Sequence, residues 1–134
     1  MKIIAIIYSL ILLFLLIFDS VWLSINFKLL YKDNLSHLLA ENINYFSAII
    51  FYLIYAFGIY FFVIKPNYSQ DKISVINIIS YGFLFGVICY STYDLTNQAT
   101  LKDWPLKITI IDICWGGILT SLTALFSILI IRKI

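Results

Sequence analysis

Two pairs of acid and indole side chains occur in the chain with the same spacing. Asp19 and Trp22 are three residues apart in "DSVW", and Asp112 and Trp115 are three residues apart in "DICW". Side chains at positions i and i+3 of an α-helix lie on the same face. A carboxylate can accept hydrogen bonds or carry a proton, and an indole offers one N–H donor and an aromatic wall. The spacing therefore predicts two helices that present an acid and an indole to a shared site.

A third carboxylate lies in the polar segment "YDLTNQATLKDWP", which follows a long apolar run. On a helix, Tyr90, Asp94 and Asn97 share a face, and Tyr93 lies beside them. Trp104, near the end of the segment, is typical of the aromatic residues that anchor a chain at a bilayer surface. We expect this segment to close a helix over the mouth of a pocket whose walls are the two acid and indole pairs.

The composition places these residues in a membrane protein. Hydrophobic residues make up 63% of the 134 residues and charged residues 12%, whereas about a quarter of an average soluble domain is charged. A helix needs roughly 20 mostly apolar residues to cross a bilayer. Four stretches have this length, at about 3–25, 43–64, 73–95 and 106–131. The predicted fold is all-α, one membrane domain over residues 1–134 that forms an integral membrane four-helix bundle.

The first stretch begins as a secretory signal peptide would, with Lys2 followed by an apolar run. However, no cleavage site of small residues follows, and the run continues past Asp19 and Trp22 to a length suited to spanning. We expect this helix to be retained.

The segment between the first two stretches predicts a short interfacial helix over about residues 34–41. Leu35, Leu38 and Leu39 recur there at helical spacing, opposite polar side chains. His37, the only histidine of the chain, lies on the polar face. A solvated imidazole is the ordinary outcome at such a position, and a ligand or proton carrier is the alternative.

Two further patterns predict helix packing. Tyr45, Tyr52 and Tyr55 form part of a stripe on the second stretch, which favours a core position, and Tyr45 alone has the depth to reach the acidic residues. The segment "GGILTS" at 116–121 holds small residues four apart, a spacing that allows a neighbouring helix to approach closely.

Four spans place both termini on one side of the membrane. The basic residues then divide five to four, with Lys2, Lys65, Lys72, Arg132 and Lys133 on the side of the termini and Lys28, Lys32, Lys102 and Lys107 on the other. This small excess favours termini in the cytoplasm. All three intramembrane carboxylates then occupy the opposite end of the bundle, where we expect them to find partners, because an isolated charge in a bilayer is costly. Close carboxylates resist simultaneous ionisation, so the cluster is also a candidate proton relay.

The segments "FDSVWLS", "HLLAEN", "YDLTNQATLKDWP" and "DICWGG" resemble a bacterial family of small four-helix inner-membrane proteins of unknown function. The resemblance extends over essentially the whole chain, and its most specific part is a YDLTNxATLKxWP signature followed by DxxWG. It implies a multi-pass protein of the bacterial inner (cytoplasmic) membrane and the importance of Asp94, Asn97, Asp112 and Trp115. It implies no substrate.

Several classes of site are excluded or weakened by what the sequence lacks. No glycine-rich phosphate loop and no zinc motif occur, so we expect no cofactor and no metal. A hard cation held by the three carboxylates and Asn97 is the alternative. The single histidine excludes a haem with two axial histidines but leaves a single-ligand haem open. A formal net charge of +2 does not favour nucleic acid as a partner.

Three functional hypotheses remain. The first is a pocket that binds or transports a small molecule or lipid headgroup, in which transport would require a homodimer because four helices are few for a translocation path. The second is a membrane-embedded lipid-modifying enzyme, with an aspartate as general acid or base and Asn97 or Tyr93 positioning the substrate. The third is a structural partner or chaperone of another membrane protein. Each of them uses the same buried polar cluster.

Overall fold

The chain folds into a bundle of four long helices. The computed structural model describes residues 2–68 and 73–133. Its elements are α1 (Lys2–Asn26), π-helical η1 (Phe27–Lys32), α2 (Asp33–Leu35), α3 (Tyr45–Gly58), π-helical η2 (Ile59–Ile64), 3₁₀-helical η3 (Lys65–Asn67), α4 (Val75–Thr100) and α5 (Leu106–Ile131). Neighbouring elements join into four helices that are long and apolar enough to cross a membrane, Lys2–Leu35, Tyr45–Asn67, Val75–Thr100 and Leu106–Ile131. The predicted all-α four-helix membrane bundle is confirmed.

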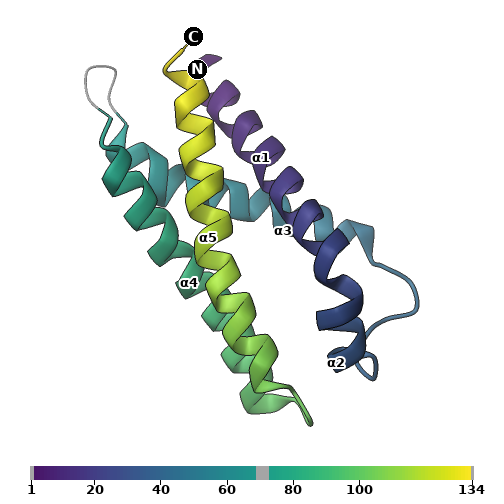
Figure 1. Cartoon of the computed structure of the whole chain (residues 1–134). Coiled ribbons are helices and arrows are strands. Elements are labelled where there is room, and N and C mark those ends of the chain that lie inside the picture. Colours follow the sequence, from purple (N-terminus) through teal and green to yellow (C-terminus); the bar gives the residue numbers. More distant parts are fainter. Residues whose placement is uncertain (1, 69–72, 134) are drawn as a thin grey trace.

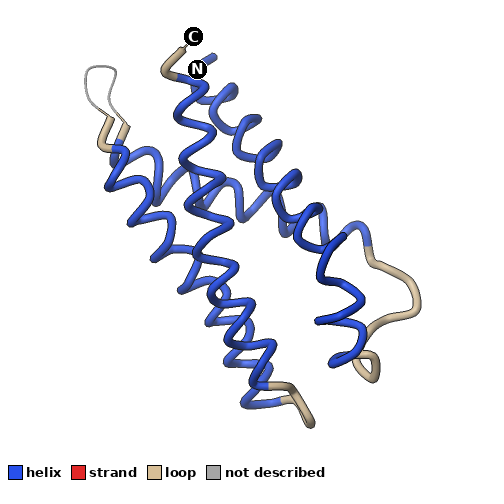
Figure 2. The backbone as a smooth tube through the Cα atoms, in the orientation of Figure 1, coloured by secondary structure: helices blue, strands red, loops and turns tan. Residues whose placement is uncertain are grey.

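The helices are arranged around α5 (Figure 1). α4 and α5 form an antiparallel hairpin, and α1 packs against α5 near the two termini, which lie close together. α3 crosses the bundle obliquely. The later part of α1 and α2 diverge from the α4–α5 hairpin, and the loops at 36–44 and 101–105 lie at the end of the molecule away from the termini (Figure 2).

Local capping interactions explain where two of the helices begin. The side chain of Asn44 accepts a hydrogen bond from the backbone N–H of Ser47 at 3.1 Å, and the hydroxyl of Ser74 accepts one from the N–H of Asn77 at 3.3 Å. Such side chains satisfy N–H groups that have no partner in the first turn of a helix. These caps fix the starts of α3 and α4.

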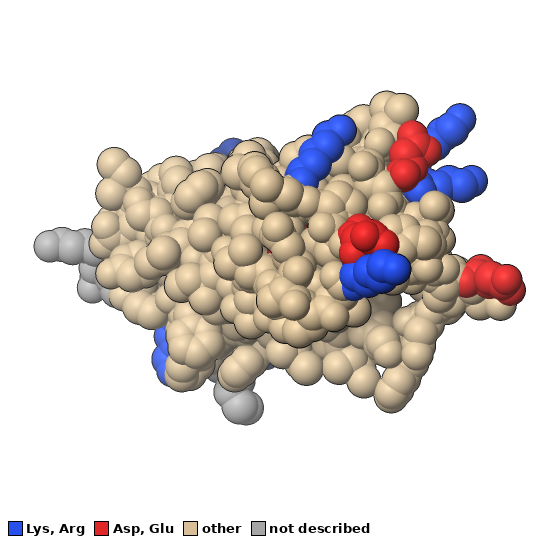
Figure 3. Space-filling model, turned by 90° about the horizontal axis from the view of Figure 1, so that it is seen from below, with Lys and Arg blue, Asp and Glu red and all other residues tan. Residues whose placement is uncertain are grey.

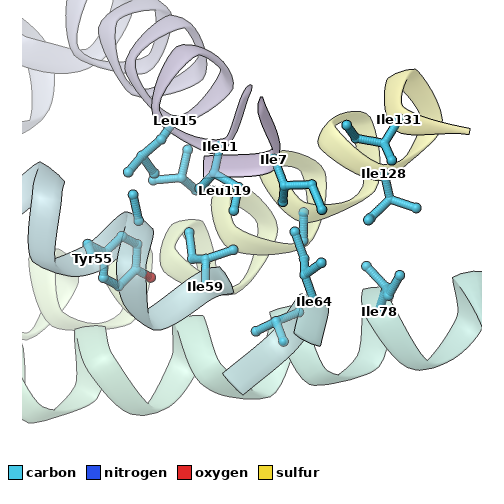
Figure 4. Packing of buried hydrophobic residues seen from close by; sticks show 13 residues of the cluster. Ile7, Ile11, Leu15, Tyr55, Ile59, Ile64, Ile78, Leu119, Ile128 and Ile131 are labelled. Atoms are coloured by element: carbon cyan, nitrogen blue, oxygen red, sulfur yellow. The ribbon is translucent and has the colours of Figure 1, made fainter. Parts of the chain in front are cut away.

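An apolar core fills the half of the bundle nearest the termini (Figure 4). Its largest fully buried side chains include Ile7, Ile11 and Leu15 of α1, Ile59 and Ile64 of η2, Ile78 of α4, and Leu119 and Ile128 of α5. Large apolar side chains also cover the outside, where Phe46 is 74% and Ile76 75% exposed. An apolar exterior of this kind suits contact with lipid, and a packed interior holds the four helices together.

Small residues allow α4 and α5 to approach closely. A Cβ atom on Gly82 would lie 3.0 Å from the Cα of Ser121, and one on Gly86 would overlap the carbonyl oxygen of Gly116. The hydroxyl of Ser121 also donates to the carbonyl oxygen of Ile79 at 2.9 Å, which joins the two helices directly. The close helix approach predicted for 116–121 is confirmed.

The connection after the first helix differs from the prediction of a separate interfacial helix over 34–41. Helical geometry continues without a break to Leu35, and residues 36–44 form a turn and an irregular loop. The reason is that Leu30 and Leu35 are buried in a second apolar cluster with Ile108 of α5, which holds the end of the first helix. The rest of the predicted apolar face, at Leu38, is 43% exposed. His37 lies in this turn and is exposed.

Candidate functional site

A cavity of about 300 Å³ lies between the first helix and the α4–α5 hairpin, in the half of the bundle away from the termini. We call it the acidic cavity. Its polar and aromatic lining includes Asp19, Phe27, Tyr31, Tyr90, Tyr93, Trp104, Asp112 and Trp115. Figure 3 looks at this end of the molecule, where a few acidic and basic side chains lie next to one another in small groups and most of the surface is uncharged. Among the described lining residues there is no Lys, Arg or His.

Asp19 joins three helices through its carboxylate. The hydroxyl of Tyr52 donates to Oδ2 at 2.6 Å, and Nε1 of Trp115 donates to Oδ1 at 3.3 Å. Asp19 itself is 8% exposed. Because Tyr52 belongs to α3 and Trp115 to α5, one buried acid connects α1 with both of these helices.

Asp112 ends a chain of two hydrogen bonds. Nε1 of Trp22 donates to the hydroxyl oxygen of Tyr31 at 2.9 Å, and that hydroxyl donates to Oδ1 of Asp112 at 2.6 Å. The second carboxylate oxygen, Oδ2, has no hydrogen-bond donor among the groups that the structure describes. Asp112 therefore has one fixed oxygen and one oxygen that a ligand in the cavity could use.

The two indoles stack on one another beside the acids. The rings of Trp22 and Trp115 are 4.3 Å apart at their centroids and nearly parallel, with an interplanar angle of 9°. The structure thus brings both acid and indole pairs, Asp19 with Trp22 and Asp112 with Trp115, to one place. Trp115 lines the acidic cavity, but Trp22 is not among its lining residues, so the predicted wall of two acid and indole pairs is only partly formed.

Fewer residues of α4 line the acidic cavity than the sequence predicts. Tyr93 lines the acidic cavity and meets Trp104 edge to face, with ring centroids 6.1 Å apart. Asp94 is fully buried but does not line the cavity, and neither of its oxygens has a hydrogen-bond partner in the described part of the chain. Asn97 is half-buried and also lies outside the lining. Of the predicted cluster of three carboxylates, only Asp19 and Asp112 therefore line the cavity.

The close packing of α4 on α5 explains the position of Asp94. Gly82, Gly86, Tyr90 and Asp94 follow one another at intervals of four residues, so they lie on one side of α4. The glycines of this row pack directly on α5, and the ring of Tyr90 packs over Gly116. Asp94 continues the same row into the helix interface, which takes its carboxylate away from the cavity.

A metal site is not supported by this geometry. Among the residues that the structure describes, no three His, Cys, Asp or Glu side chains are close enough together to hold a metal ion. The alternative of a hard cation held by three carboxylates and Asn97 therefore lacks its ligand set in residues 2–68 and 73–133.

Two tyrosines that contact the acids were not among the predicted site residues. Tyr31 reaches Asp112 from η1, and Tyr52 reaches Asp19 from α3. Tyr45, which the sequence predicts to lie at the depth of the acidic residues, is instead 71% exposed. Tyr52 belongs to the helical stripe of the second stretch, which was predicted to pack in the core. The prediction therefore did not include a hydrogen bond from its hydroxyl to an acid.

The fold and this site define a multi-pass α-helical membrane protein with two carboxylates in an aromatic cavity. The sequence profile of a family described as "Predicted membrane protein (DUF2177)" matches residues 4–129, and the chain belongs to this family. No curated protein and no solved structure matches the chain.

Proposed function

We propose that this protein binds a small cationic group in the acidic cavity, either as a free molecule or as part of a lipid headgroup. The observation that carries the proposal is the combination of Asp19 and Asp112 with several aromatic rings in one cavity of about 300 Å³ whose described lining has no basic side chain. Two carboxylates give the cavity a negative potential, and a cation over an aromatic face gains roughly 0.5–2 kcal/mol.

The two acids have different roles in this proposal. Both oxygens of Asp19 already accept hydrogen bonds, from Tyr52 and Trp115, so Asp19 contributes charge and fixes the walls. Asp112 has one oxygen held by Tyr31 and the other without a donor among the described groups. Asp112 is therefore the direct acceptor for an ammonium N–H or the counter-ion of a quaternary ammonium. Tyr31, Tyr93 and Trp115 supply aromatic surface around it.

Binding is better supported than transport. The core between the acidic cavity and the termini is packed with apolar side chains, among them Leu15, Ile59 and Leu119, which are at most 1% exposed. A cation crossing this region would exchange two carboxylates for apolar side chains and a few hydroxyls such as those of Thr120 and Thr123, at a cost of several kcal/mol.

We propose that the protein lies in the bacterial inner membrane with its termini in the cytoplasm. Support comes from the family resemblance and from the five-to-four division of basic residues. The acidic cavity, which lies at the end away from the termini, would then be near the outer face of that membrane.

The proposal is tested by titrating the purified protein, in an uncharged maltoside detergent, with tetramethylammonium and ethylammonium in a calorimeter. We expect saturable binding of at least one of these cations. Asp112→Asn should weaken the binding by about tenfold or more, since loss of a charged contact costs roughly 1.5–3 kcal/mol.

The matched control is Asp103→Asn. Asp103 is exposed in the 101–105 loop at the same end of the molecule, and its backbone φ of 58° suits an asparagine equally well. This variant loses the same charge and should keep the wild-type affinity. Absence of saturable binding to folded wild-type protein, or equal weakening in both variants, would contradict the proposal. Recovery of a chemically altered ligand would favour the lipid-modifying enzyme instead.

A further inference from the structure

We infer that the ligand is an amphiphile whose cationic headgroup occupies the acidic cavity and whose hydrocarbon chain lies in an apolar groove between α3 and α4. This inference rests on the proposed function of the acidic cavity and adds a second, separate binding surface to it. The class of ligand is a membrane lipid or related molecule with an ammonium headgroup.

The groove consists of two adjoining apolar hollows. The first, of about 390 Å³, is lined by Phe51, Tyr55, Cys89, Tyr90 and Tyr93. The second, of about 340 Å³, shares Phe51, Tyr55 and Cys89 with the first and continues past Gly58, Phe62 and Phe85. Because three residues line both hollows, they form one continuous surface, which we call the α3–α4 groove.

The groove begins where the acidic cavity ends. Tyr90 and Tyr93 line the acidic cavity and also the first hollow of the groove. The ring of Tyr90 is fixed between the helices, since it packs over Gly116 and meets the ring of Tyr55 at a centroid distance of 6.3 Å. These two tyrosines thus form a common wall, with carboxylates on one side and only apolar or aromatic surface on the other.

The direction of the groove matches that of a lipid chain. Tyr93, Cys89 and Phe85 follow one another by one helical turn each along α4, so the groove extends for about 12 Å. α4 is long and apolar enough to span a membrane, and its Tyr93 end is the cavity end. The groove therefore leads from the headgroup site toward the bilayer interior.

The position of the groove favours a hydrocarbon chain. Its hollows of about 390 and 340 Å³ adjoin the acidic cavity through Tyr90 and Tyr93, which suits a chain attached to a headgroup in that cavity. A flexible chain can follow the aromatic walls. In a bilayer, where the surrounding lipid tails are as apolar as the groove, van der Waals packing against these walls holds the chain.

The experiment uses a photoreactive octyltrimethylammonium with a diazirine at the end of its chain. The probe is added to the full-length protein in vesicles of phosphatidylglycerol, which has no ammonium headgroup, and the labelled residues are mapped by mass spectrometry after illumination. We expect labels on the residues of the α3–α4 groove. Asp112→Asn should reduce this labelling strongly, because the chain is then no longer anchored by its headgroup.

Two cysteine variants separate the groove from the cavity. Cys89→Phe places a ring in the groove, which should remove the groove labels and leave tetramethylammonium binding in detergent unchanged. Cys114→Phe is the matched control, because Cys114 is exposed on α5 and lines neither hollow, so it should preserve both. If Cys89→Phe does not fold, Phe51→Ala, which removes part of the groove wall, provides the same comparison.

The possible results distinguish this inference from the proposed function. Tetramethylammonium binding combined with labels spread evenly over all lipid-facing helices would overturn the chain site and leave the cation site intact. Absence of both tetramethylammonium binding and groove labelling in the wild-type protein would overturn the cation site and the chain site. Equal loss of groove labels in Cys89→Phe and Cys114→Phe would also overturn the chain site, as would a protein dimer that covers the groove and excludes the probe.

Discussion

At the scale of single residues, Asp19 and Asp94 are both buried acids with opposite surroundings. Asp19 accepts a hydrogen bond on each oxygen, whereas no described group donates to Asp94. A buried acceptor with partners stabilises the fold, and one without partners costs free energy. The two acids should therefore respond differently to removal of their charge.

We expect Asp19→Asn to lower the free energy of unfolding by about 1–3 kcal/mol, because the amide turns one acceptor into a donor that faces Tyr52 or Trp115. Tyr52→Phe should have a similar effect, since it leaves an oxygen of Asp19 without its 2.6 Å partner. Asp94→Asn should change stability little or raise it. Thermal unfolding in detergent, followed by circular dichroism, measures all three, and greater damage from Asp94→Asn than from Asp19→Asn would contradict this ranking.

The spacing of residues on one helix was a good guide to the site, but the contacts between helices were not. The i and i+3 rule placed Asp19 with Trp22 and Asp112 with Trp115, and the structure stacks the two indoles. The rule says nothing of how one helix is rotated against the next. That rotation decides that Tyr52 reaches Asp19 and that Asp94 turns into the α4–α5 interface.

At the scale of elements, the π-helical segment η1 explains the missed contact of Tyr31. Trp22 and Tyr31 are nine residues apart, and an ideal α-helix with 3.6 residues per turn would place them about half a turn apart. The i to i+5 bonding of a π-helix puts more residues in each turn and so rotates the later side chains less. η1 thereby brings Tyr31 to the hydroxyl-to-indole distance of 2.9 Å from Trp22. Hydrophobic periodicity gave no signal for this change of register.

The four spans, by contrast, follow from length and composition alone. Each predicted stretch lies largely within a helix of the structure. The reason is that a single segment in lipid can pair all its backbone N–H and C=O groups only by forming a helix. The predicted interfacial helix failed because tertiary burial of Leu30 and Leu35 extended the first helix to Leu35. Local periodicity could not anticipate that contact with α5.

The α4–α5 hairpin gives an element-scale prediction about glycine. Gly86→Ala should destabilise the protein by about 1–3 kcal/mol, because the new Cβ would overlap the backbone of Gly116 and force the helices apart. Gly58→Ala is the control, since its Cβ would meet only the end of the Phe85 ring, at 2.7 Å, and that ring can move. Unfolding midpoints of the two variants in the same detergent test this, and equal midpoints would argue against backbone contact at Gly86.

At the scale of the whole molecule, the acidic cavity and the main apolar core occupy opposite halves of the bundle. The apolar core, whose packing Figure 4 shows, fills the half that contains both termini. The lining of the acidic cavity lies in the other half, where Figure 1 shows the loops at 36–44 and 101–105. A binding site near one membrane face can exchange ligand with the water or the leaflet on that side only. The side on which these loops lie therefore decides where the ligand comes from.

This arrangement predicts a pattern of cysteine accessibility. In a background with Cys89→Ala and Cys114→Ala, single cysteines at Ser36 or Thr100 should react with a membrane-impermeant maleimide in intact bacterial cells, because both positions are exposed at the cavity end. Cysteines at Ile3 or Asn77, which are exposed at the end of the termini, should react only after the inner membrane is permeabilised. The four substitutions leave every lysine and arginine in place, since those charges influence orientation. A reversed pattern would keep the four-span topology but would place the acidic cavity near the cytoplasmic face. If the cysteines at positions 36 and 100 reacted differently from one another, the two loops would not lie on the same side of the membrane, and the proposed position of the site would be wrong.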